Sequence, residues 1–298
     1  MRRVTLQDYK RRMLRVLVHI QQHLDEQLGL EELARLASFS PCHFHRVFTG
    51  MVGESVKEHI RRLRLERAAS RLKLSEAPVT AIAFEAGYAS HEAFSRSFRA
   101  AFGASPSQFR SDKRPASTAA AASGLHYRDG SRARDFRAAP TGGRIMNVKL
   151  GRRRPVRVAF MRHIGPYDEV GETWDKLLPL LGKDGLLAGD TQLIGICHDD
   201  PEVTPKHKIR YDACVSVDAD FQPSGDVGVQ TIPGGDYAMT THFGPYSRLG
   251  KTYMKLLGQW LPRSGRELAS SPCFEIYLND PQSTEPVDLL TDIYAPLR

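Results

Sequence analysis

Two arginines, Arg46 and Arg96, occupy the same place in two copies of one sequence pattern. Each arginine lies between two phenylalanines that are four residues apart. A guanidinium group can bind the O6 and N7 atoms of guanine with two hydrogen bonds, or it can clamp a phosphate. Apolar residues at positions i and i+4 predict a helix that buries one side, so the arginine between them points elsewhere. The flanking pairs are Phe44 with Phe48 and Phe94 with Phe98, which we expect in the core.

Each copy extends beyond the phenylalanines into a helix-turn-helix pattern. The first copy runs from Glu32 to Ser55 and the second from Ile82 to Pro106, and the two stay 50 residues apart from the phenylalanines onward. A helix, a tight turn and a second helix are the means by which a chain presents a recognition helix to the DNA major groove. Two copies in one register predict two recognition helices in one all-α domain.

A long helix is predicted between the two copies, over residues 55–74. About 20 residues at 1.5 Å each span roughly 30 Å. Successive major-groove faces on one side of B-DNA lie about 34 Å apart. A connector of this length can hold two recognition helices in adjacent groove segments, so a single chain could read an asymmetric site.

Charge is distributed unevenly and divides the chain into three parts. Residues 1–112 carry a net charge of +6, residues 113–155 carry +9, and residues 156–298 carry −7. The basic amino-terminal part favours double-stranded DNA as a partner, whereas the acidic part does not. Residues 113–144 are rich in Ala, Ser, Gly and Arg, so we expect few buried side chains there and predict a basic, flexible linker. The predicted domains are therefore 1–112 and 145–298.

The cysteines and histidines do not indicate a metal site or a cofactor. Cys42, Cys197, Cys214 and Cys273 contain no C-x-x-C pair, which suits a reducing cytoplasm better than a disulfide framework. His43 and His91 have no carboxylate or cysteine partner at ligand spacing, so we expect them at the surface or on DNA. No apolar stretch resembles a signal peptide or a membrane span, so we expect a cytoplasmic protein.

The carboxyl-terminal part contains a second internal repeat. The segment "VAFMRHIGPYDEVGETWDKLLPLL" at 158–181 is repeated as "YAMTTHFGPYSRLGKTYMKLLGQWL" at 237–261, with an offset of 79 residues. The strand after each helix aligns with an offset of 80. Each half therefore predicts a strand, a Gly-Pro turn, a helix and two strands. Two such β-α-β-β halves would form an α+β domain of pseudo-twofold symmetry with a groove between them.

Comparison of the halves separates structural residues from candidate ligand contacts. His163 and His242 occur in both halves, so we expect them to stabilise the turns or to lie at a pocket edge rather than to act as catalysts. Glu275, in contrast, aligns with Gly195 and so occurs once. A carboxylate in the middle of an apolar strand is costly unless it is paired, either with an internal Arg or Tyr or with an organic cation. The aromatic residues that we expect beside it are Tyr167, Trp174, Tyr246, Tyr253 and Tyr277.

The amino-terminal part resembles the AraC/XylS family of transcription regulators over about 100 residues. The resemblance rests on "SFSPCHFHRVFTGMVGESVKEHIRRLRLERAASRLK" followed by "VTAIAFEAGYASHEAFSRSFRAAFGASPSQFR". It implies contacts with bases and phosphates at eight positions. These are Pro41, Cys42, His45 and Arg46 in the first recognition helix, and His91, Glu92, Ser95 and Arg96 in the second.

The carboxyl-terminal part, residues 145–298, resembles the gyrase-inhibitor-like effector-binding domain that also occurs in multidrug-sensing regulators. The motifs are the duplicated H-x-G-P-Y, "KIRYDACVSV", "PGGDYAM" and "CFEIYLNDP". Together the two resemblances predict a bacterial transcription regulator that senses a small aromatic or cationic effector, with RNA polymerase as a further candidate partner. Two alternatives remain open: a hydrolase that uses Glu275, as some relatives of this domain are thought to be, and a protein-interaction module.

Overall fold

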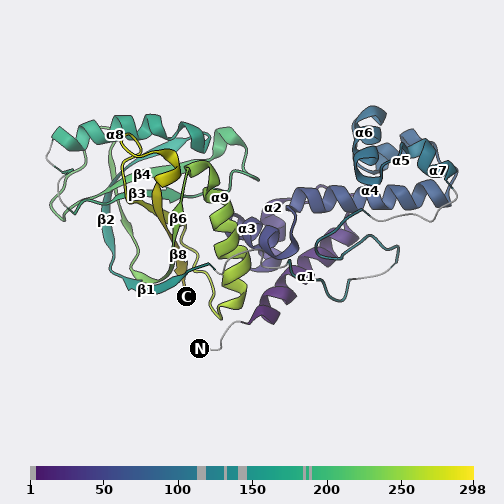
Figure 1. Cartoon of the computed structure of the whole chain (residues 1–298), viewed down its shortest axis with the longest axis horizontal. Helices are drawn as coiled ribbons and strands as arrows, with labels where there is room; N and C mark the ends of the chain where they lie inside the picture. Colours follow the sequence, from purple (N-terminus) through teal and green to yellow (C-terminus); the bar gives the residue numbers. More distant parts are fainter. Residues whose placement is uncertain (1–4, 113–118, 131–132, 140–145, 184–185, 188–189) are drawn as a thin grey trace. The chain divides into compact units, whose positions relative to one another are not determined.

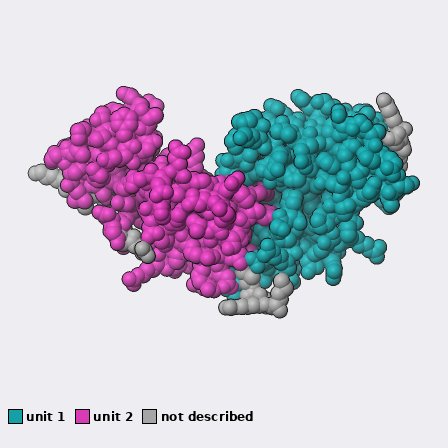
Figure 2. Space-filling view, turned by 180° about the vertical axis from the view of Figure 1, so that it is seen from behind, with its two compact units in different colours: residues 1–5, 142–298 teal, residues 6–141 magenta. Residues whose placement is uncertain are grey.

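The computed structural model describes residues 5–112, 119–130, 133–139, 146–183, 186–187 and 190–298. The chain divides into two compact units, shown in Figure 2. We call residues 6–141 the helical unit, and residues 142–298 together with 1–5 the sheet unit.

The helical unit contains the two predicted helix-turn-helix pairs. In Figure 1, α1 to α3 gather at one end of the long helix α4 and α5 to α7 at the other. The first pair is α2 with α3 and the second is α5 with α6. The helices are α1 (Leu6–Gln22), α2 (Leu30–Ala37), α3 (Pro41–Val52), α4 (Val56–Leu74), α5 (Val79–Glu85), α6 (His91–Phe102) and α7 (Pro106–Ser111).

Local sequence signals explain where both recognition helices begin and end. The Ser40 hydroxyl accepts a hydrogen bond from the His43 amide at 3.4 Å, and the Ser90 hydroxyl accepts one from the Ala93 amide at 3.2 Å. Such caps satisfy amides that have no partner inside the helix. Gly53 and Gly103 end the two helices in the left-handed region, with φ of 87° and 76°, where a glycine carries no steric penalty.

The phenylalanines that flank Arg46 and Arg96 form the centres of the two halves of this unit. Phe44, Phe48, Phe94 and Phe98 are all fully buried, as the sequence predicted. In the second half, Phe94 and Phe98 pack against Leu65, Leu72 and Ile82, so α4 contributes to the core beneath the second recognition helix.

The segment after α7 differs from the sequence prediction. We expected few of its residues to be buried, but Leu125 and Phe136 are buried on the helical unit. The buried Glu66 of α4 accepts a hydrogen bond from the Tyr127 amide at 2.7 Å, and Arg62 donates one to the Leu125 carbonyl at 2.9 Å. The expectation of an unpacked segment is therefore wrong for residues 119–130, where a charged pair on α4 binds the backbone, and for residues 133–139, where the Ala139 amide donates to the Met51 carbonyl at 2.7 Å. Residues 113–118, 131–132 and 140–144 of the predicted linker lie outside the described residues.

The sheet unit is built on one eight-stranded antiparallel sheet with the strand order β1-β6-β8-β7-β3-β4-β2-β5. The strands are β1 (Lys149–Arg153), β2 (Val156–Ile164), β3 (Leu193–Cys197), β4 (Arg210–Ser216), β5 (Gly228–Ile232), β6 (Gly235–Phe243), β7 (Cys273–Tyr277) and β8 (Leu290–Leu297). The two longer helices are α8 (Gly171–Lys183) and α9 (Leu249–Tyr253), and α9 continues as a π-helix over Met254–Trp260.

Both predicted β-α-β-β halves are present, as β2-α8-β3-β4 and β6-α9-β7-β8. The sequence missed the edge strands β1 and β5, which the order places beside β6 and β2. The ladder between β3 and β7 joins the halves and sets Gly195 directly opposite Glu275. The spatial pseudo-twofold symmetry stays a prediction. Among the described residues, no helix combines the length and apolar character needed to cross a bilayer.

Candidate DNA interface and effector site

The two recognition helices present their predicted contact residues differently. On α6, Glu92 and Arg96 are exposed and His91 and Ser95 are half-buried. On α3, Pro41 is exposed and Cys42 is half-buried, but His45 is only 2% exposed and Arg46 only 9%. The DNA contacts of all eight residues stay predictions.

His43 corrects one expectation of the sequence. We expected this side chain at the surface or on DNA, but it is buried in the first turn of α3. Burial and the nearby Arg46 charge lower the pKa of His43 to about 4, so the ring is neutral at physiological pH.

In the sheet unit, the carboxylate of Glu275 lies among aromatic hydroxyl groups. The side chain is 4% exposed on the central strand β7. Tyr253 donates a hydrogen bond to Oε1 at 3.0 Å, and Tyr277 donates one to Oε2 at 2.9 Å. The Cys197 thiol lies 3.5 Å from Oε1. Hydrogen bonds of this kind compensate for the loss of water around a buried charge.

The hydrogen bonds continue from Glu275 into the first half of the domain. The Tyr211 and Tyr277 hydroxyl oxygens are 2.8 Å apart, and the Trp174 indole N–H donates to the Tyr211 hydroxyl at 3.0 Å. The single hydroxyl proton of Tyr277 lies in the hydrogen bond to Glu275. Tyr211 must therefore be the donor in the hydrogen bond between Tyr211 and Tyr277. The chain therefore runs from Trp174 through Tyr211 and Tyr277 to the carboxylate, and we call it the Trp–Tyr–Tyr–Glu relay. All of its donors point towards the carboxylate, so each hydrogen bond of the relay strengthens the next.

The remaining predicted aromatic residues belong to the same cluster. The rings of Tyr246 and Tyr277 are 5.4 Å apart, and the ring of Tyr167 lies 6.0 Å from that of Tyr211. The structure thus brings together all six residues predicted to bind the ligand. Sequence reasoning missed Tyr211 and Cys197. Tyr211 stands within the quoted motif "KIRYDACVSV", but periodicity alone does not separate it from ordinary core residues.

Gly195 makes room for the relay. A Cβ atom at this position would lie 2.4 Å from the Tyr277 hydroxyl and 2.5 Å from the Tyr211 hydroxyl. The two hydroxyl groups therefore meet over the backbone of β3, at the place where the other half of the repeat carries the Glu275 side chain.

The tyrosines of this cluster are held in their protonated form. Burial and the charge of Glu275 raise the pKa of Tyr277 well above its ordinary value. Burial also raises the pKa of Tyr211 strongly, and burial with the Glu275 charge raises that of Tyr246 to about 12. The Tyr277 hydroxyl therefore stays protonated and donates to the carboxylate over the whole physiological pH range.

Comparison with known proteins assigns both parts of the chain. Residues 146–298, half of the chain, match the model of the GyrI-like small-molecule-binding domain, and residues 33–112 match a helix-turn-helix domain model. The chain belongs to the GyrI-like family. Its amino-terminal part is an AraC-type helix-turn-helix region, so the protein is a DNA-binding transcription regulator with a GyrI-like small-molecule-binding domain.

Individual relatives cover one part or the other. A DNA gyrase inhibitor of Erwinia billingiae is 29% identical over 51% of this chain and 97% of its own length. The regulatory protein SoxS of Salmonella typhimurium is 35% identical over 30% of this chain and 85% of its own length. Among solved structures, the carboxyl-terminal domain of EcmrR is 21% identical with a TM-score of 0.42, over 52% of this chain and 99% of that domain.

Residues common to both halves of the GyrI-like domain have structural partners. The His163 ring contacts the Thr173 hydroxyl and the Pro166 carbonyl, both at 3.2 Å. The His242 ring makes the equivalent two contacts, with the Thr252 hydroxyl at 2.8 Å and the Pro245 carbonyl at 3.2 Å. In both halves the threonine lies ten residues after the histidine and the proline three residues after it. Each histidine thus ties its Gly-Pro turn to the following helix, as the sequence predicted.

Asp212 is another buried carboxylate of this domain, and its partners are Arg162, His198 and Gln230. Arg162 binds both of its oxygens, at 2.7 and 2.9 Å, and His198 and Gln230 contact Oδ2 at 2.8 and 2.9 Å. Burial alone would raise the pKa of Asp212, but the hydrogen bonds from His198, Arg162 and Gln230 hold it far below its usual range. This carboxylate is therefore a charged structural link between β2, β4, β5 and the residue that follows β3.

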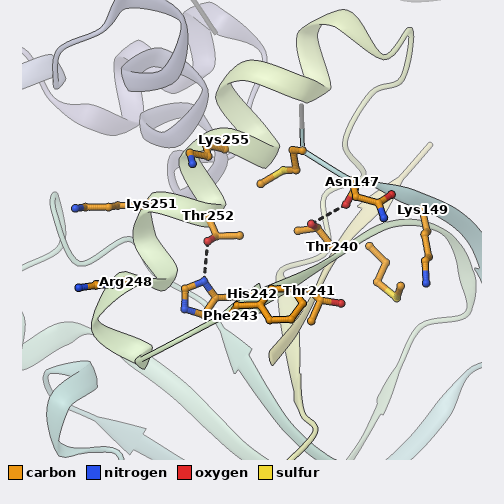
Figure 3. A pocket seen from close by; sticks show the side chains of 12 residues that line it. Asn147, Lys149, Thr240, Thr241, His242, Phe243, Arg248, Lys251, Thr252 and Lys255 are labelled. Atoms are coloured by element: carbon orange, nitrogen blue, oxygen red, sulfur yellow. Dashed lines mark hydrogen bonds between the residues drawn. The ribbon is translucent and has the colours of Figure 1, made fainter. Parts of the chain in front are cut away.

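A pocket of about 670 Å³ in the GyrI-like domain lies between β1, β6 and α9 and is shown in Figure 3. None of its lining residues belongs to the aromatic cluster around Glu275. Within the described part of the chain, no group of three or more His, Cys, Asp or Glu side chains is arranged to hold a metal ion.

Proposed function

We propose that the GyrI-like domain senses a lipophilic organic cation, and that Glu275 supplies the charge that selects it. The observation that carries this proposal is a single buried carboxylate surrounded by aromatic rings. Aromatic faces attract cations, and a desolvated carboxylate strengthens that attraction. A domain that only bound another protein would not need a buried charge at this place.

Effector binding requires the aromatic cluster to rearrange. The Tyr253 and Tyr277 hydroxyl groups occupy hydrogen-bonding sites of the carboxylate, and the described pocket lies elsewhere in the domain. A cation that reaches Glu275 must displace at least one of these hydroxyl groups. Displacement of Tyr277 also breaks the Trp–Tyr–Tyr–Glu relay, so ligand binding in one half of the domain changes the contacts of the other.

We further propose that the domain binds its effector without turnover. General acid–base catalysis works best with groups whose pKa lies near the working pH. The hydroxyl groups of Tyr211, Tyr246 and Tyr277 have raised pKa values and are weak proton donors near neutrality. If Glu275 were instead the base or nucleophile of a hydrolase, a bound ester would be consumed, and Glu275→Gln would abolish its turnover.

In the DNA-binding part, we propose that α3 and α6 read adjacent segments of the major groove. Arg46 and Arg96 would supply the contacts that discriminate between bases. The exposure of Glu92 and Arg96 on α6 supports this role for the second helix. The burial of Arg46 means that α3 must become accessible before its arginine can reach a base.

Calorimetric titration with a matched pair of ligands tests the cation proposal. Tetraphenylphosphonium carries a positive charge, whereas triphenylphosphine oxide is neutral with similar aromatic groups. Glu275→Gln keeps the shape and removes the charge, so we expect affinity for the phosphonium to fall about tenfold or more, about 1.4 kcal/mol, with little change for the oxide.

The control variant is Glu172→Gln, which removes the same charge from an exposed position on α8. It should leave both affinities unchanged. Equal losses for the two ligands in Glu275→Gln would make the carboxylate a structural hydrogen-bond acceptor and would remove the basis for a cation sensor.

A further inference from the structure

One face of the helix that begins at α9 carries a stripe of three cations. Arg248 precedes α9, Lys251 lies within it, and Lys255 lies in its π-helical continuation. We call these three residues the α9 stripe. Figure 3 shows their side chains extending to the same side of the helix from successive turns. All three are exposed, and none of the ion pairs recorded among the described residues includes them.

The equivalent surface in the first half of the domain is net acidic. At the repeat offset of 79 residues, Arg248 aligns with Glu169, Lys251 with Glu172, and Lys255 with Lys176. Two further exposed acids, Asp168 and Asp175, align with Ser247 and Met254. The helix surface has thus changed from acidic in one half to basic in the other, while the turn histidine and the buried leucines of the helix are the same.

The pocket beside the stripe does not itself offer a site for a small anion. Its hydroxyl groups have internal partners, since Thr240 donates to the Asn147 carbonyl at 2.9 Å and Thr252 contacts the His242 ring at 2.8 Å. Its positive charge lies at the rim, with Lys149 of β1 on the wall opposite the stripe. The charged surface is therefore an open, elongated one.

We propose that the α9 stripe binds the phosphate backbone of the same DNA that the helix-turn-helix part reads. Seven residues of helix extend over about 10 Å, whereas one DNA strand rises by about 3.4 Å per nucleotide, so the stripe spans about three phosphates. A single small anion is too short to contact all three cations at once. The proposal rests on DNA binding by the helical unit, which brings a polyanion to this domain at high effective concentration.

The charge of the rest of the domain explains why a local stripe is needed. Residues 156–298 carry a net charge of −7, which repels DNA overall. The acidic remainder of the domain is repelled by DNA, and only the face that carries the α9 stripe can approach the phosphates. The domain would therefore bind DNA in one preferred orientation. The stripe would thus position the effector domain on the DNA as well as add affinity.

The salt dependence of DNA binding by the full chain tests the proposal. The probe is a random-sequence duplex of about 60 base pairs, longer than the roughly 20 that two adjacent groove segments occupy. For the triple variant Arg248→Gln, Lys251→Gln, Lys255→Gln, we expect affinity at low salt to fall about tenfold or more. The slope of log K against log salt should become shallower by about 2 to 3, because each lost phosphate contact removes about 0.9.

A control variant separates a local contact from net charge. Lys176→Gln, Lys206→Gln, Lys208→Gln changes the charge of the same domain by the same amount at three other exposed lysines. It should keep the wild-type slope, as should the charge-conserving variant Arg248→Lys, Lys251→Arg, Lys255→Arg.

Three results would overturn the assignment. Equal losses in the two glutamine variants would point to net charge alone. An unchanged slope in the stripe variant would remove the DNA contact. An unchanged slope with impaired transcription by purified RNA polymerase would assign the stripe to a protein partner. Failure of DNA binding by the helical unit itself would be recognised separately, because the wild-type chain would then not bind the duplex.

Discussion

Substitution of Gly195 by alanine should destabilise the GyrI-like domain through a single methyl group. The added Cβ would lie 2.4 Å from the Tyr277 hydroxyl and 2.5 Å from the Tyr211 hydroxyl, so both rings must move. Overpacking of this kind costs about 1–3 kcal/mol. Displacement of Tyr277 also removes a hydrogen bond to a buried carboxylate, which is worth about 1.5–3 kcal/mol. Alanine also has less conformational freedom than glycine in the unfolded chain, which stabilises the folded state by about 0.4–1 kcal/mol. The net loss should be about 1.5–5.5 kcal/mol.

Tryptophan fluorescence measures this loss selectively, because both tryptophans, Trp174 and Trp260, lie in the GyrI-like domain. For a domain of this size, 1 kcal/mol shifts Tm by about 2–4 °C, so Tm should fall by roughly 3 to 22 °C. Gly151→Ala is the matched control. It also adds a methyl group to a strand glycine of the same sheet, but nothing lies within 4 Å of the new atom. If both variants melt at the wild-type temperature, the relay does not depend on the space above Gly195.

Three further perturbations test other parts of the molecule. Arg96→Ala should cost about 1–3 kcal/mol of DNA affinity on the specific site, and an equal loss on all sequences would make Arg96 a phosphate contact. Burial opposes ionisation of Glu54, but hydrogen bonds from its neighbours lower its pKa to about 2. Its stabilising contribution is therefore complete above pH 4.5 and is lost as pH falls towards 2. Acid unfolding of Glu54→Gln should be less steep there, whereas the exposed Glu31→Gln should behave as wild type. Glu66→Ala removes the carboxylate that holds the segment after α7, so limited trypsin digestion should cleave faster after Arg128, and resistance equal to wild type would contradict that role.

The helical part of the fold was predictable because each local signal agrees with the tertiary structure. Ser40 and Ser90 cap the helices that the phenylalanine spacing indicates, and Gly53 and Gly103 end them. The repeat offset in the second half likewise identified the β-α-β-β units without any information on contacts. Each of these signals lies within a few residues of the element that it specifies, so it can be recognised in a single sequence.

The features that were missed depend on contacts between distant residues. Strand β1 has four exposed residues out of five and shows no alternation that would distinguish it from a loop. Leu125 and Phe136 are isolated apolar residues in a polar stretch, and their segment is held by distant residues, such as Glu66, which binds the Tyr127 amide from some sixty residues away. Tyr211 joins the relay only because Gly195 leaves space for it on the neighbouring strand. The periodicity of apolar residues along the sequence does not reveal a pairing between such distant residues.

The pairing of Gly195 with Glu275 also bears on how this domain arose. The two residues are equivalent in the repeat and stand opposite each other on the β3–β7 ladder. In a dimer of identical half-domains these positions would hold the same residue twice, for example two glutamates or two glycines. Two glutamates would have left no room for the tyrosine hydroxyl groups and would have faced each other with like charges. Two glycines would have provided no charge at all. A lone carboxylate with space beside it therefore requires both copies to be encoded in one chain and to differ at this position, which a symmetric dimer of identical halves cannot provide.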